Sequence, residues 1–132
     1  MSTLPTPNPA LVVELRQLID AARQRAATAV NAELTLLYWQ VGERINRDIL
    51  GSQRAGYGEE IVVSLGQRLN AEYGRGFSNK NLHHMVRFAQ VFPDMQIVST
   101  LSRQLAWSHF LELIYLNDSL ARDFYAQMCV QE

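Results

Sequence analysis

The chain has 132 residues, of which 48% are hydrophobic, and its formal net charge is −1. This length predicts a single domain with its own core, and the near-neutral charge excludes a chain that is basic throughout. The single cysteine, Cys129, excludes a disulfide framework and fits a reducing cytoplasm. Because no segment resembles a signal peptide or reaches the length of a membrane span, we expect a cytoplasmic protein.

The chain begins with a segment rich in proline. Residues 1–9 hold three of the four prolines, and we expect them to be a disordered lead-in to one helical domain over residues 10–132. Asn8 and Pro9 suit the N-cap and the first position of a helix, where the missing N–H of proline costs nothing. The sequence therefore predicts a helix that begins directly after Asn8.

Residues 10–50 contain no proline and a single glycine, Gly42, and their pattern predicts a long amphipathic helix of roughly 60 Å. A bend or break near Asn31, or two helices folded back on each other, remain alternatives. Such a length exceeds what the domain needs, so we expect a homodimer through this helix. The apolar residues recur every three to five positions, at Leu11, Leu15, Leu18, Ala22, Ala26, Ala29, Leu34, Leu37, Val41, Ile45 and Ile49.

An aromatic cluster lies in the second half of this helix and is predicted to belong to the core. Its members are Leu36, Leu37, Tyr38 and Trp39. The glycine-rich segment 51–58 is then predicted to be a loop.

Residues 58–92 are predicted to form two helices joined by a short turn. The first helix has an apolar stripe of Ile61, Leu65 and Leu69, with Val62 and Tyr73 beside it. Residues 74–77 hold two glycines that stop it, and Ser78 suits the N-cap of the next helix. This arrangement is the plan of a helix-turn-helix.

The second of these helices has two different faces. Its apolar face is predicted to consist of Leu82, Met85, Val86 and Ala89. Its polar face consists of Lys80, His83, His84, Arg87 and Gln90.

Positive charge gathers on and around this polar face. Residues 75–103 carry four cationic side chains against Asp94 alone, whereas acids outnumber cations before and after them. Asparagine and arginine pair bidentately with adenine and guanine, so Asn79, Asn81, His83, His84 and Arg87 are candidates for a DNA groove. The cationic residues outside the groove would contact phosphates. The candidate DNA-binding residues are Arg75, Ser78, Asn79, Lys80, Asn81, His83, His84, Arg87 and Arg103.

Two alternatives stand beside the DNA hypothesis for these residues. Asn81 could brace the turn rather than touch DNA, and the whole set could be an ordinary solvated helix face. A small local excess of charge supports only weak binding by one subunit. DNA binding would therefore also require dimerisation or a second domain.

The rest of the chain is also predicted to be helical, which makes the fold class all-α. Residues 95–106 are predicted to be a loop with a helical turn, in preference to two strands that would make the unit winged. Residues 107–116 are predicted to be a buried helix that His109 helps to start. A last helix is expected over residues 119–130, with Leu120, Phe124 and Met128 at i+4 spacing.

Four blocks of the sequence resemble the N-terminal domain of YhcG-like bacterial proteins. The blocks are NAELTLLYWQVG (31–42), GFSNKNLHHMVRF (76–88), LAWSHFLEL (105–113) and ARDFYAQM (121–128), in the family's order. In that family a helical, DNA-binding domain precedes a PD-(D/E)XK nuclease domain, often near restriction and defence systems. The resemblance implies a DNA-targeting domain of a nuclease.

The chain departs from the whole family pattern because it has no PD-(D/E)XK arrangement. Its one lysine, Lys80, has no acidic residue two positions before it, and the chain ends where the linker to the nuclease domain is expected. Glu59 and Glu60 suit a helix N-terminus rather than a metal site, and adjacent His83 and His84 cannot share a metal on a helix. We therefore expect a non-catalytic chain without metal, cofactor or small-molecule substrate, either a cut domain or a naturally shortened relative.

A second hypothesis competes with DNA binding. In it the long helix is a dimerisation and scaffolding module that assembles nuclease subunits or binds another protein. A continuous basic surface would favour DNA, and an exposed apolar groove would favour a protein partner. An independent enzyme would need convergent ionisable groups in a pocket, which the sequence does not predict.

Overall fold

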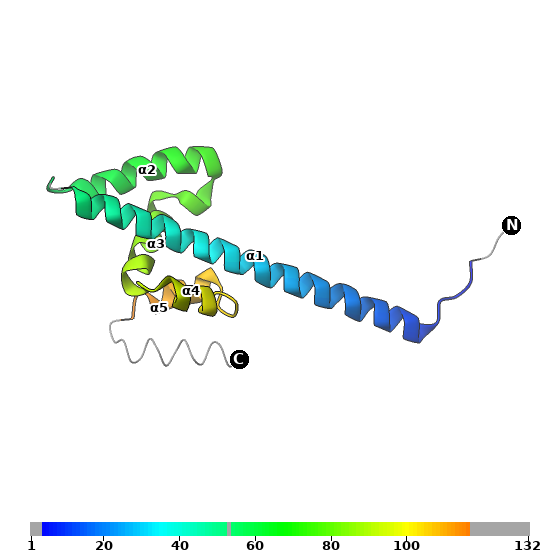
Figure 1. The fold of residues 1–132 in the computed structure, drawn as a ribbon. Coiled ribbons are helices and arrows are strands. Elements are labelled where there is room, and N and C mark those ends of the chain that lie inside the picture. Colours follow the sequence, from blue (N-terminus) through cyan, green and yellow to red (C-terminus); the bar gives the residue numbers. More distant parts are fainter. Residues whose placement is uncertain (1–3, 53, 117–132) are drawn as a thin grey trace.

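The computed structural model describes residues 4–52 and 54–116, and within them every regular element is helical (Figure 1). The all-α fold class is confirmed. The elements are α1 (Pro9–Gly51), α2 (Tyr57–Tyr73), the 3-10 helix η1 (Arg75–Phe77), α3 (Asn79–Val91), α4 (Met95–Leu101) and α5 (Trp107–Leu113). The predicted last helix, residues 119–130, lies outside the described residues.

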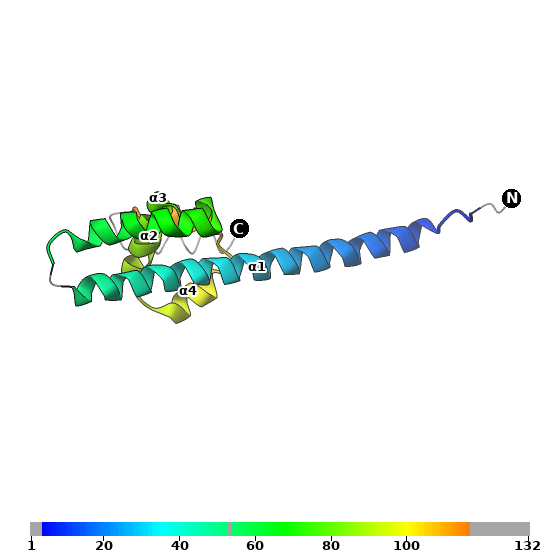
Figure 2. The same ribbon diagram turned by 90° about the horizontal axis from the view of Figure 1, so that it is seen from above.

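Helix α1 is one uninterrupted helix of 43 residues. The Asn8 side chain accepts a hydrogen bond from the N–H of Ala10, and Pro9 occupies the first turn, as the sequence predicts. The break considered near Asn31 does not occur, because the alanine-rich middle of the helix contains good helix formers and neither glycine nor proline. The N-terminal half of α1 projects away from the other helices (Figures 1 and 2).

Helix α3 is the centre of the core, because it packs across the second half of α1. Leu82, Met85 and Phe88 are completely buried there, and Trp39 of α1 is buried beside them. The Trp39 indole N–H donates to the carbonyl of Phe92, 2.6 Å away. Trp39 thus confirms the predicted aromatic core, whereas the prediction for Leu37 is wrong: its side chain is 40% exposed, because it faces away from α3.

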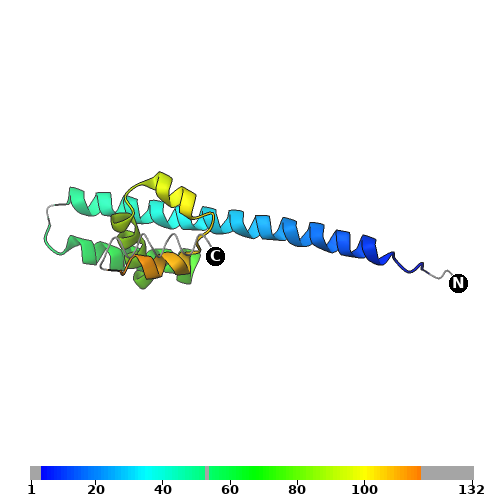
Figure 3. The same cartoon turned by 90° about the horizontal axis from the view of Figure 1, so that it is seen from below.

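Helix α2 and helix α4 lie on opposite sides of α1 (Figures 2 and 3). Val62 is the buried contact of α2, while the stripe of Ile61, Leu65 and Leu69 is only half-buried and Tyr73 is exposed. Helix α2 begins with Glu59 and Glu60 in its first turn, as expected from its dipole. The loop before α2 is shorter than predicted, since Gly51 still belongs to α1.

The segment after α3 is a helix rather than a wing of strands. Asp94 accepts a hydrogen bond from the N–H of Gln96 and so caps α4, whose Val98 is buried in the core. In α5, the predicted role of His109 is confirmed, because its Nδ1 accepts from the N–H of Ala106. None of the helices in the described ranges is both long and apolar enough to cross a membrane.

Candidate nucleic-acid interface

The turn between α2 and α3 is tight, and glycines make it possible. Gly74 ends α2 with φ of 97°, a left-handed conformation that favours glycine. Gly66 of α2 lies so close to α3 that a Cβ there would stand 2.8 Å from the Cα of Asn79. The helices therefore approach each other at the first residue of α3, which fixes the direction in which α3 leaves the turn.

Two polar side chains secure the start of α3. The Ser78 hydroxyl accepts from the N–H of Asn81, which confirms Ser78 as the N-cap. The Asn81 amide donates to the carbonyl of Gly76, and its oxygen accepts from the indole N–H of Trp107, 3.3 Å away. Asn81 therefore braces the turn against α5, which is the alternative role that the sequence left open.

A group of candidate residues remains exposed on η1 and the first turns of α3. Its members are Arg75, Asn79, Lys80 and His83. Residues 75–91 contain no aspartate or glutamate, and neither Arg75 nor Lys80 forms an ion pair within the described residues. We call this group the α3 polar face. It could place donors and positive charge on one external ligand.

Two other candidates on α3 are engaged by Tyr115. The Arg87 guanidinium lies 4.8 Å from the centre of the Tyr115 ring, and its Nε–H donates to the carbonyl of Ile114. The His84 ring is hydrogen-bonded through Nδ1 to the Tyr115 hydroxyl. Burial, then Lys80, then His83 lower the pKa of His84 below its usual value of 6.5. Near neutral pH His84 is therefore uncharged.

Arg103 is exposed, but its position is set by α1 rather than by α3. The Asn31 amide of α1 donates to the carbonyls of Ser102 and Leu105, at 3.1 and 3.0 Å, and so holds the turn that carries Arg103. The structure thus brings the candidates on η1 and α3 together in one region. Arg103 lies outside it, on the turn after α4 that Asn31 holds against α1.

The structure has two further features that the sequence does not predict. Tyr115 was not a candidate, although it contacts both His84 and Arg87. An isolated aromatic residue at the end of a buried helix has no local signal for such a role.

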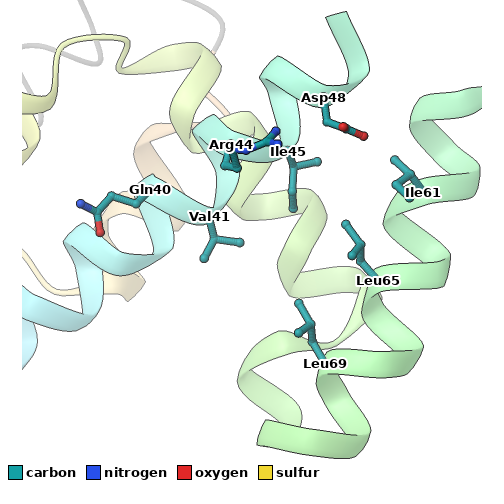
Figure 4. A pocket seen from close by; sticks show the side chains of 8 residues that line it. All are labelled: Gln40, Val41, Arg44, Ile45, Asp48, Ile61, Leu65 and Leu69. Carbon is teal, nitrogen blue, oxygen red and sulfur yellow. The ribbon is translucent and has the colours of Figure 1, made fainter. Parts of the chain in front are cut away.

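The second feature is an open groove of about 520 Å³ between α1 and α2. Figure 4 shows Val41 and Ile45 of α1 facing Leu65 of α2 across it.

The groove is apolar along its floor and charged at its rim. Ile61 and Leu69 extend the apolar wall on α2, while Arg44 and Asp48 stand on α1 (Figure 4). The apolar stripe that the sequence predicts on this helix therefore lines an open groove. Within the described ranges, no three His, Cys, Asp or Glu side chains come together as a metal site requires.

Comparison with known proteins places this helical domain in a family. The chain belongs to the family described as the DUF1016 N-terminal domain, which matches residues 14–132. It is 38% identical over 89 residues to the Escherichia coli K12 protein named "Putative nuclease YhcG". The match covers 67% of this chain but only 24% of that protein, so the chain spans a small part of its relative. The resemblance to YhcG-like proteins is confirmed, and no solved structure matches the chain.

Proposed function

We propose that this domain binds duplex DNA through the α3 polar face and thereby directs the nuclease of its family to DNA. The observation that carries the proposal is the charge of residues 75–91, which hold Arg75, Lys80 and Arg87 without an acidic residue. Such a surface attracts a polyanion even when the net charge of the chain is −1.

The contacts within the domain divide the candidates into different roles. Arg75 and Lys80 are exposed and unpaired within the described part of the chain, which suits phosphate contacts. Asn79 and His83 are exposed on the first turns of α3, where side chains of a helix in the major groove reach base edges. Asn81 and Ser78 position this helix, and Arg87 would have to leave Ile114 to touch DNA.

The proposal also requires more than one copy of the surface. Few phosphate contacts give weak binding, because most of the affinity comes from counterions released by each neutralised phosphate. Two domains held in one assembly would add their contacts and raise the affinity through a high effective concentration.

Fluorescence anisotropy with a random duplex at two salt concentrations tests the proposal. The double substitution of Arg75→Ala and Lys80→Ala should weaken binding and reduce the salt slope by about one unit for each phosphate that is no longer neutralised. Arg47→Ala is the matched control, because Arg47 is an exposed cation that pairs with Glu43 on α1, away from this face. Equal salt slopes for the double variant and the unaltered domain would refute DNA binding by this face.

A second function, self-association, is favoured by a different observation. The N-terminal half of α1 carries large apolar side chains that are about half exposed, among them Leu11, Leu15 and Ile19. A helix that extends beyond its domain with an exposed apolar stripe normally packs against a partner. We therefore propose a homodimer through α1, and the mass of the chain in solution tests this independently of DNA.

A further inference from the structure

An apolar stripe runs along α1 and continues beyond the projecting half of the helix. Its side chains are substantially exposed: Leu15 is 48%, Ile19 52%, Val30 59% and Leu37 40% accessible. The next positions on the same line are Val41 and Ile45, which form one wall of the groove between α1 and α2 (Figure 4). The exposed stripe and the groove are therefore one continuous apolar surface.

The positions of this stripe are mirror-related about Thr28. Each residue of the stripe before Thr28 has an apolar counterpart at the same distance after it. The pairs are Leu11 with Ile45, Leu15 with Val41, Ile19 with Leu37, Ala22 with Leu34, and Ala26 with Val30. A two-fold dimer requires such self-complementarity, because each contact occurs twice with the residues exchanged.

We propose that two copies pair through α1 in an antiparallel arrangement centred near Thr28, so that the projecting half of each α1 lies in the partner's α1–α2 groove. This inference rests on the proposed self-association and is independent of DNA binding. The partner's Leu11 and Leu15 would cover Val41 and Ile45, while Ile61 and Leu65 of α2 close over them. The occupant of the groove is thus a second copy of the same helix.

A parallel pairing would not use these features. It would place each residue level with its own copy. It would also bring Ala22 against Ala22, where the antiparallel register brings the small Ala22 against the large Leu34. Each groove would remain open, because the projecting halves would cover one another. The fit of small against large side chains and the covering of the groove therefore both favour the antiparallel form.

Cross-linking between differently sized copies tests the register. Cys129→Ser removes the one native thiol, and Leu15→Cys and Val41→Cys are placed in separate chains that are co-expressed and treated with a short bismaleimide. We expect the mixed pair to cross-link and each single variant alone to remain uncross-linked. In the antiparallel dimer two copies of position 15 are roughly 40 Å apart at 1.5 Å per residue.

Thr28→Cys provides the matched control, since Thr28 is at the mirror point but on the opposite face of α1 from Ala26 and Val30. It should not cross-link. Cross-linking of Leu15→Cys with itself would overturn the antiparallel register while leaving self-association intact. A monomeric mass at micromolar concentration would overturn both this inference and the proposed homodimer. The apolar stripe would then be a candidate binding surface for a different protein.

Discussion

Gly42 of α1 lies directly against the backbone of Met85 of α3. A Cβ at position 42 would stand 1.9 Å from the carbonyl oxygen of Met85 and 2.4 Å from its carbonyl carbon. The two helices can cross at this distance only because glycine has no side chain. Gly42 ends the first segment that carries the family resemblance, and Met85 lies in the second, so the crossing joins these segments in the core.

Substitution of Gly42 should therefore damage the fold. Gly42→Ala forces a methyl group into the backbone of α3, and we expect a loss of about 3 kcal/mol in the free energy of unfolding. Urea denaturation measures it. Gly51→Ala, near the end of the same helix, meets no atom within 4 Å and should leave stability unchanged or slightly raised. A loss below about 1 kcal/mol for Gly42→Ala would show that α3 is free to move away.

Asn81 should matter for stability, whereas Asn79 should matter for binding alone. Asn81→Ala removes the hydrogen bonds to Gly76 and Trp107, and we expect a loss of about 1–3 kcal/mol from the partners left unsatisfied. Asn79→Ala, on the exposed first turn, should unfold at the same urea concentration as the unaltered domain. If Asn81→Ala is as stable as Asn79→Ala, Asn81 does not brace the turn.

The hydroxyl of Thr35 is buried and has no hydrogen-bond partner among residues 4–52 and 54–116. Thr35→Val replaces it with a methyl group of similar shape and should raise the free energy of unfolding by about 1 kcal/mol, because the desolvation penalty of the hydroxyl disappears. Thr28→Val is the control on the same helix, since the Thr28 hydroxyl donates to the carbonyl of Gln24 and is exposed. Destabilisation by Thr35→Val would mean that the hydroxyl finds a partner in solution.

The lowered pKa of His84 should make stability depend on pH. The unfolded chain takes up a proton on His84 near pH 6.5, while the folded domain does so at lower pH. The stability associated with neutral His84 is therefore full above pH 6.5 and falls as the pH drops toward the folded value. Unfolding across this window should show a smaller decline for His84→Gln than for the unaltered domain, with His83→Gln as control. If the free energy of unfolding declines equally with falling pH in all three proteins, the proposed contribution of His84 is wrong.

Local sequence determined most of the described helices and several of their ends. The spacing of apolar residues, the caps at Asn8 and Ser78, and the glycine at position 74 act within a few residues, so they are readable without a structure. The family resemblance and the buried Trp39 follow from the same local patterns. The predicted wing alternative was excluded only by the structure, because residues 95–101 are too short for periodicity to separate helix from strand.

Tertiary structure alone decided which faces are covered and which are free. Leu37 and Trp39 are neighbours in the sequence but point to nearly opposite faces of α1. Only the packing of α3 decides which of these faces is buried. Arg87 and Ile114 are 27 positions apart, and Trp107 and Asn81 are 26 apart. Contacts over such separations depend on how the helices cross. The split of the polar residues of α3 into bracing and exposed groups, and the opening of the groove beside α1, are therefore properties of the packed domain.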